Sequence, residues 1–230
     1  MPVCKNISEL EIQSCNYFQV KRLEATDEEW EEQLKEVFEE SGLLGGQILR
    51  VVPKGLVNLN YDIHTCVHMG TEITPEESAY PPTAISYPGE GASEDKFHTL
   101  VLLDADLNEK LHWMVINIPG AKVHEGQIIT AYSGPNPAAG SGLHRYITLV
   151  MEQESGKILD SSVVQKYKTE SSCSGAEIRE NFHFQTLREE LNLSEPVAVN
   201  YFTQQYDSFV ENINGHCLKN EAITPHPLYK

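Results

Sequence analysis

The sequence predicts a mainly β protein, built as an antiparallel sandwich with helices gathered at the two ends of the chain. From Pro53 onward, short runs of alternating or continuous apolar residues recur, which is typical of strands. Turn-forming segments rich in proline and glycine separate these runs, for example at 80–82 and 133–137. Little helical periodicity lies between them, and this combination favours a sandwich over a doubly wound α/β sheet.

Chain length and charge restrict the domain organisation and the classes of function. A chain of 230 residues is long enough for one domain with an additional segment. We assign residues 1–44 to an acidic N-terminal extension and residues 45–230 to the main domain. The 34 acidic and 17 basic residues give a net charge of −17, which repels nucleic acid and anionic membrane surfaces. No apolar run approaches the roughly 20 residues of a membrane-spanning helix. We therefore expect neither a nucleic-acid-binding nor a membrane-spanning protein.

The first expected element is an amphipathic helix over 26–41. Thr26 and Glu29 fit a capping box, and Gly42 is placed to end the helix. Its apolar positions form one stripe on an otherwise acidic surface: Trp30, Leu34, Val37 and Phe38. We expect this stripe to pack on the main domain. The alternative is a helix that binds a partner or a second copy of the chain.

The strands are expected where the apolar runs occur in the main domain. These runs are Leu56–Tyr61, Phe97–Leu103, Trp113–Ile118, Tyr146–Met151 and Val197–Phe202. Toward the C-terminus, short helices are expected over 187–191 and 206–213. The expected architecture is a set of central strands with helices before and after them.

The cysteines predict free thiols in a reducing compartment. They are odd in number and show no Cys-x-x-Cys spacing, so a zinc or redox site is not indicated: Cys4, Cys15, Cys66, Cys173 and Cys217. The N-terminal residues lack the apolar segment of a signal peptide. We therefore expect a cytoplasmic protein; the alternative is the secretory pathway, where the sequons at Asn6 and Asn192 become relevant.

Polar groups at the ends of apolar strands are the candidates for a functional site. Asp104 and Asp106 follow the run 97–103, and alternation puts both on one side if the strand continues through them. His112 opens the next strand. Farther along, a glycine-rich turn enters a strand whose alternation puts His144 and Tyr146 on one face and Arg145 on the other.

Each of these groups alone has an ordinary structural explanation, such as a turn cap, a core histidine or an ion-pair partner. Together, two imidazoles, a carboxylate, a phenol and the amides of a Gly/Pro loop suit a small ligand with an anionic and a cationic end. The chain has no GxGxxG, Walker, HExxH or GxSxG motif. We therefore predict no catalytic residues, no cofactor and no metal.

Three segments also carry a family resemblance. They read Leu-Val-Leu-Leu-Asp-Ala-Asp at 100–106, His-Trp-Met-Val-Ile-Asn-Ile-Pro-Gly at 112–120 and Gly-Ser-Gly-Leu-His-Arg-Tyr-Ile at 140–147. These segments resemble the phosphatidylethanolamine-binding protein family, which includes Raf kinase inhibitor protein. The Gly-x-Gly-x-His-Arg-Tyr pattern after a strand that opens with His is the most specific signal. Further similarity runs from about residue 38 to residue 209.

The resemblance implies a central antiparallel sheet packed on a second small sheet, with C-terminal helices and a pocket for phosphorylated head groups. Carried over by position, the pocket residues are Asp104, His112, His144 and Tyr146, with main-chain groups of Gly134, Pro135 and Pro137. Asp106 and Arg145 are expected beside the pocket in structural roles. The implied function is non-catalytic binding of phosphatidylethanolamine head groups or similar small anions, with a kinase or a protease as a protein partner.

Three alternatives come from different classes of function. One is a structural or interaction module with a vestigial pocket, because the family's Asp-Pro-Asp-x-Pro segment reads Asp-Ala-Asp-Leu-Asn at 104–108 and the loop that follows is shortened. Another is a hydrolase in which His112 and His144 act as acid and base and Asp104 orients one of them. The third is a metal site built from the same groups.

Overall fold

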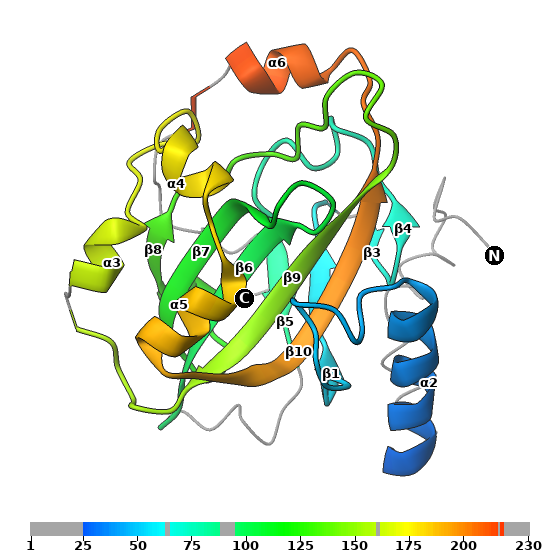
Figure 1. The fold of residues 1–230 in the computed structure, drawn as a ribbon, viewed down its shortest axis with the longest axis vertical. Helices are drawn as coiled ribbons and strands as arrows, with labels where there is room; N and C mark the ends of the chain where they lie inside the picture. Colours follow the sequence, from blue (N-terminus) through cyan, green and yellow to red (C-terminus); the bar gives the residue numbers. More distant parts are fainter. Residues whose placement is uncertain (1–24, 63–64, 88–94, 160–161, 216, 219–230) are drawn as a thin grey trace.

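The computed structural model describes residues 25–62, 65–87, 95–159, 162–215 and 217–218, and a twisted seven-stranded sheet forms its centre (Figure 1). The strands of this sheet are β1 (Gly55–Leu56), β4 (Thr71–Glu72), β6 (Phe97–Asp104), β7 (Lys110–Pro119), β8 (Gln127–Thr130), β9 (His144–Gln153) and β10 (Leu193–Gln204). Their order is β1-β10-β9-β6-β7-β8, and β4 also pairs with β10. All five long expected runs therefore lie in or beside strands of the structure.

Antiparallel pairing dominates this sheet, as the sequence predicts. Strands β10, β9, β6, β7 and β8 are antiparallel to their neighbours, whereas the short strands β1 and β4 run parallel to β10. A second, three-stranded sheet has the order β3-β2-β5, with β2 (Asn58–Asn60), β3 (Cys66–Val67) and β5 (Ala84–Ser86). The expected mainly β fold, a central sheet with a second small sheet, is confirmed.

Both faces of the central sheet are buried, which explains the continuous apolar runs in its strands. Along β6, Val101 and Leu103 belong to one hydrophobic cluster, which also contains residues of the helices. Leu100 and Leu102 belong to the other cluster, which contains residues of the small sheet. Alternation along the strand thus divides the core into a helix side and a small-sheet side.

The acidic N-terminal helix forms as predicted. Helix α2 (Asp27–Glu40) has Thr26 as its N-cap, and the capping box with Glu29 is complete. Trp30, Leu34 and Phe38 are buried in the helix-side cluster, and Val37 packs against it. The stripe therefore packs on the sheet. The expected extension before residue 25 lies outside the described residues.

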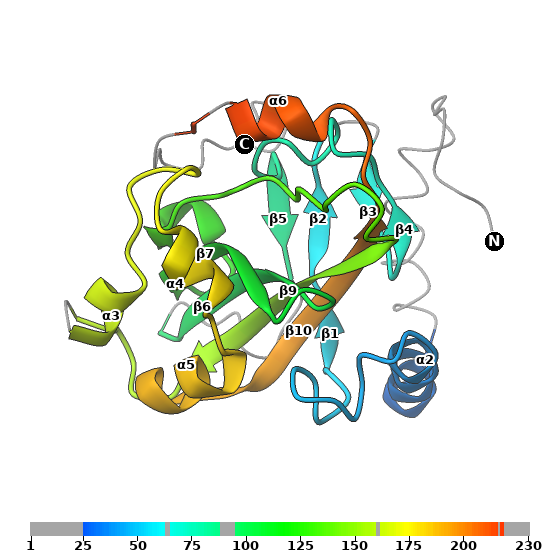
Figure 2. The same ribbon diagram turned by 45° about the horizontal axis from the view of Figure 1, so that its top comes forward.

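Four helices follow the middle strands of the sheet. They are α3 (Ser162–Lys166), α4 (Ala176–Glu180), α5 (Phe184–Leu191) and α6 (Val210–Gly215), with a 3₁₀ turn η1 at Val123–Glu125 before β8. The sequence predicts α5 and α6 approximately but not α3 and α4, which have five residues each and little periodicity. In Figure 2, α6 lies over the loop between β8 and β9.

The expectation of free thiols is wrong. Cys173 and Cys217 form a disulfide with a sequence separation of 44 residues, and Cys66 is also disulfide-bonded. The Cys173–Cys217 pairing does not follow from local spacing, because the fold brings together two segments that are 44 residues apart. Cys4 and Cys15 lie outside the described residues.

Candidate functional site

The strand ends of β6, β7 and β9 bring the predicted site residues together. Asp104 ends β6 and pairs across the sheet with Tyr146 of β9. On β7, Trp113 pairs with Leu102 and Leu111 with Leu103, so His112 is the extra residue of a β-bulge. A bulge changes the direction of a side chain, and the His112 ring here contacts the Tyr146 ring edge-on at 5.3 Å. The four predicted side chains thus meet on the small-sheet side of the sheet.

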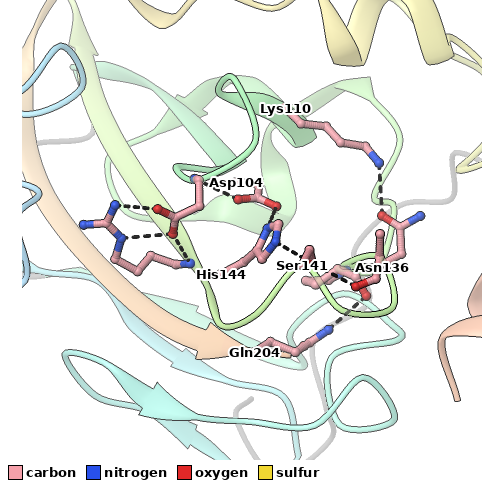
Figure 3. Close-up of polar contacts among 10 residues, drawn as sticks. Asp104, Lys110, Asn136, Ser141, His144 and Gln204 are labelled. Carbon is pink, nitrogen blue, oxygen red and sulfur yellow. Dashed lines mark hydrogen bonds and ion pairs between the residues drawn. The ribbon is translucent and has the colours of Figure 1, made fainter. Parts of the chain in front are cut away.

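A hydrogen-bonded chain runs from Asp104 through His144 to Ser141 (Figure 3). His144 Nδ1 lies 2.7 Å from Asp104 Oδ2, and His144 Nε2 lies 2.8 Å from Ser141 Oγ. Asp104 and His144 are buried, whereas Ser141 is exposed between two glycines with positive φ. Asp104 therefore fixes the orientation of the imidazole, and a hydroxyl outside the predicted set contacts its other nitrogen.

His112 is held in a neutral form. Its Nδ1 lies 2.9 Å from the Ser133 carbonyl oxygen, which can only accept, so Nδ1 carries the proton. Burial and the nearby charges of Lys110 and Arg179 lower the pKa of His112 to about 3. Nε2 is then an acceptor, and it is buried with no hydrogen-bond partner in the part of the chain that the structure describes. His112 thus offers a ligand a lone pair and not a positive charge.

Tyr146 places a second unsatisfied polar atom in the site. Its hydroxyl is buried near the Asp104 carboxylate and makes no hydrogen bond of normal length within the described residues, and its ring stacks on Phe202 at 5.3 Å. Burial and the nearby Asp104 carboxylate raise the pKa of Tyr146 above its ordinary value, so it is a neutral phenol. Buried polar groups of native proteins nearly always have partners, so two such atoms side by side indicate a place for ligand or water.

Asp106 and Arg145 lie on the other side of the strand end. The two aspartates are expected on one side only if the strand continues through them, and β6 ends at Asp104, so this condition is not met. Asp106 accepts hydrogen bonds from the backbone N–H and Nε of Arg145 at 2.7 and 3.0 Å. Although partial burial raises the pKa of Asp106, these bonds lower it overall. Arg145 Nη1 also donates to the Ser41 carbonyl at the end of α2, so this pair joins the sheet to the N-terminal helix.

The loop 133–137 offers few free main-chain donors. Pro135 and Pro137 have no N–H, and the Pro135 carbonyl already accepts from Gln204 Nε2 at 3.0 Å. Gly134 packs against Ala79, where a Cβ would lie 3.1 Å from the Ala79 carbonyl oxygen. Within the described part of the chain, the backbone N–H groups of Gly134 and Asn136 make no hydrogen bond. The loop can therefore offer a ligand two amides at most.

Two basic residues outside the predicted set lie next to the site. Lys110 pairs with Asp104 across the strands, and its Nζ donates to Asn136 Oδ1 at 3.1 Å. Arg179 of α4 is buried and donates to the carbonyl oxygens of His112 and Ala131 at 3.1 and 2.8 Å. Burial lowers the pKa of Arg179 to about 10. Lys110 is missed because a lysine that follows a turn at the start of a strand is usually exposed to solvent, and Arg179 because nothing in its short helix indicates burial.

The site is covered in this structure. The four predicted side chains are 0–5% exposed, and a small pocket of about 30 Å³ elsewhere is lined by Ala79, Tyr80, Gly134 and the α6 segment instead. The shortened segment after Asp104 is a tight turn with positive φ at Asn108 and Glu109, and Glu109 accepts a hydrogen bond from the Phe184 N–H at 2.7 Å. A ligand therefore needs local opening of the covering groups.

The described residues contain no group of three or more metal-ligating side chains suited to a metal ion.

The family model for phosphatidylethanolamine-binding protein matches residues 63–202, which is more than half of the chain. This chain belongs to the phosphatidylethanolamine-binding protein family. The predicted resemblance is thus confirmed.

No helix in the described residues has the length and apolar character needed to cross a membrane.

The chain is also similar to curated proteins and to solved structures. The chain is 27% identical over 175 residues to putative odorant-binding protein A5 of Drosophila melanogaster, a match that covers 73% of this chain and 78% of the relative. It is 28% identical over 169 residues to a 26 kDa secreted antigen of Toxocara canis, with 69% and 59% covered. The carboxypeptidase Y inhibitor, solved with its cognate proteinase, shares the fold, with a TM-score of 0.61, 21% identity and coverage of 80% and 99%.

Proposed function

We propose that the chain is a non-catalytic binding protein for zwitterionic, phosphorylated head groups of the phosphoethanolamine type. One observation carries this proposal: among the described residues, His112 Nε2 and the Tyr146 hydroxyl are buried beside the Asp104–His144 pair without a hydrogen bond of normal length. An acceptor nitrogen next to a carboxylate suits an ammonium group, and a phenol can donate to a phosphate oxygen. A head group with both charges matches this arrangement better than a simple anion does.

Calorimetric titration with O-phosphoethanolamine tests the proposal. We expect the wild-type chain to bind and His144→Ala to weaken binding by roughly 1.5–3 kcal/mol, because the charge-assisted hydrogen bond that holds the Asp104 carboxylate in place is lost. His124→Ala is the matched control, since His124 lies in an exposed 3₁₀ turn away from the site. Equal affinity of wild type and His144→Ala contradicts the pocket assignment. Undetectable binding by the wild type supports the vestigial-pocket alternative.

Hydrolysis is a second candidate, and the Ser141 position is the observation that favours it. Ser141 Oγ, His144 and Asp104 have the order of contacts of a nucleophile, a base and an orienting acid. The Ser141 hydroxyl also lies 2.8 Å from the Ala138 carbonyl oxygen, and His112, the predicted second catalytic histidine, faces Ser133 instead. We expect a fluorophosphonate probe to leave Ser141 unmodified. Labelling that disappears in His144→Ala supports the hydrolase.

The protein partner and the compartment are further parts of the proposal. A protease partner is the one to test first, because a structural neighbour is a carboxypeptidase Y inhibitor; a kinase partner stays a prediction from the family.

Disulfides persist in oxidising compartments, so the bonded cysteines favour a secreted protein over the predicted cytoplasmic one, and one relative is named a secreted antigen. Mass spectrometry of protein alkylated at cell lysis tests this, and modified Cys173 and Cys217 thiols support the cytoplasm.

A further inference from the structure

The positive charges around the site are unequally available to a ligand. Arg145 is paired with Asp106, and Arg179 directs its guanidinium to backbone carbonyl oxygens. His112 is neutral because Ser133 fixes its tautomer and burial disfavours its charged form. His144 is hydrogen-bonded to Asp104, whose negative charge offsets a protonated imidazole. None of these four groups can readily offer a phosphate an uncompensated positive charge.

Lys110 differs from the other four. Within the described part of the chain no ion pair joins its ammonium group to a carboxylate, and its hydrogen-bond partner is the neutral side chain of Asn136 at 3.1 Å. Asp104, Glu180 and Arg179 are the charged groups that act on it. Lys110 is also partly buried beside the candidate site, so its charge is screened less than that of a surface lysine. A partly buried cation with a neutral partner is well suited to receive an anion.

Asn136 connects Lys110 to the C-terminal helix. Its Oδ1 accepts from Lys110, and its Nδ2 donates to Asn214 Oδ1 of α6 at 2.9 Å. Figure 3 shows Lys110 extended toward Asn136, beside the Asp104–His144–Ser141 chain. Asn136 and Asn214 are polar and partly or fully exposed, so water can replace these two hydrogen bonds at small cost. The Lys110–Asn136–Asn214 bridge can therefore open when a ligand enters.

We propose that Lys110 is the residue that binds the phosphate of the ligand, and that it exchanges Asn136 for a phosphate oxygen on binding. This inference rests on the proposed head-group function and adds the residue that sets the charge preference of the site. The backbone N–H of Asn136, which makes no hydrogen bond among the described residues, belongs to the residue that Lys110 contacts and is the second donor to the phosphate. The orientation follows: the phosphate lies at Lys110, and the amine points toward the acceptor nitrogen of His112.

The same geometry assigns a ligand preference. O-phosphoethanolamine is a phosphomonoester, whose second ionisation near pH 6 leaves it mostly doubly charged at pH 7.5. Glycerophosphoethanolamine, the deacylated lipid head group, is a phosphodiester with a single negative charge. A site with one available ammonium group favours the doubly charged ester. The two compounds also separate a free metabolite from a lipid head group as the source of the ligand.

Titration of both compounds into the full chain at pH 7.5 tests this role. The variants are Lys110→Gln and Lys110→Met, which remove the charge, and Lys110→Arg, which keeps it. Lys166→Gln is the control, because it changes net charge equally at an exposed residue paired with Glu190. We expect Lys110→Gln and Lys110→Met to weaken O-phosphoethanolamine binding by about tenfold or more. We expect a smaller loss for the diester, near wild-type affinity for Lys110→Arg and no change for Lys166→Gln.

The outcomes separate this inference from the proposed function. If the wild type binds and either neutral Lys110 variant binds equally well, the role of Lys110 is wrong while the head-group function stands. If the wild type binds neither compound, both proposals fail. A tenfold loss in Lys110→Gln that Lys110→Arg restores, and that shrinks as salt is raised, supports the inference. A loss that is the same for both compounds and independent of salt contradicts it.

Discussion

His112 and His144 carry the same side chain but differ in what they can offer a ligand. His144 is bonded at both ring nitrogens, to Asp104 and Ser141. His112 is bonded at Nδ1 alone, and its Nε2 is an unsatisfied acceptor. In the sequence, both histidines lie near the ends of predicted strands, and nothing in the local pattern distinguishes their roles. The difference arises from the β-bulge and from burial beside Lys110, which no local pattern reveals.

The acceptor nitrogen of His112 predicts discrimination between primary and quaternary amines. Phosphoethanolamine can donate an N–H to Nε2, whereas phosphocholine has no N–H and is bulkier. We expect phosphocholine to bind more weakly by about 0.5–1.5 kcal/mol, the net value of one hydrogen bond, or more if its methyl groups do not fit. Competition calorimetry with the two compounds measures this difference. Equal or tighter binding of phosphocholine contradicts the assigned role of His112.

At the scale of elements, α2 is part of the hydrophobic core although its surface is strongly acidic. Leu34 is fully buried in the cluster that also contains residues of β9 and β10. We expect Leu34→Ala to lower the free energy of unfolding by about 2–5 kcal/mol, as for other buried leucines. Glu36→Ala, at an exposed position of the same helix, is the control and should change stability little. A Leu34→Ala protein as stable as the control in urea denaturation shows that the helix is not integral to the fold.

The disulfide anchors the segment that follows α6. Cys217 lies two residues after the end of this helix, and its bond to Cys173 closes a long stretch of chain. We expect Cys173→Ser combined with Cys217→Ser to lower the free energy of unfolding by about 2–4 kcal/mol. Thermal unfolding of the variant and of the wild type, without reductant, measures the effect. An unchanged melting temperature implies that the pairing adds nothing to stability.

The sequence predicts some elements better than others, for physical reasons. The capping box at Thr26 and the apolar runs of β6, β7 and β9 are local signals, so these elements form where expected. Asp104, His144 and Tyr146 meet because alternation and pairing place them at one strand end. The roles of Arg179 and Gln204 and the Cys173–Cys217 bond depend on contacts between distant segments. Such contacts have no local sequence signal.

For the molecule as a whole, buried neutral histidines predict sensitivity to acid. Burial lowers the pKa of His112 to about 3 and that of His68 to about 4, whereas an unfolded histidine titrates near 6.5. Between these values the unfolded state binds protons that the folded state does not, so stability falls as pH decreases below about 6.5. Each histidine contributes about 1.4 kcal/mol per pH unit within this window.

Urea denaturation of the wild type and His112→Asn between pH 7 and pH 4 tests this linkage. We expect the variant to be less stable at pH 7, because the ring packing is lost, but to lose stability less steeply with acidification. Parallel pH profiles would show that His112 is not the neutral, buried group described here. Above pH 6.5, His112 and His68 should cause no change of the free energy of unfolding with pH in either protein.

The central claim is that the head group binds between His112, His144 and Tyr146, in a protein whose net charge of −17 opposes any anion. Histidine-selective ¹⁵N nuclear magnetic resonance, recorded during titration with O-phosphoethanolamine, measures this directly. We predict saturable shifts of the ring nitrogens of His112 and His144, largest at His112 Nε2, with the His124 signals unchanged. Binding that leaves both site histidines unshifted, or no shift at any histidine, would contradict the account.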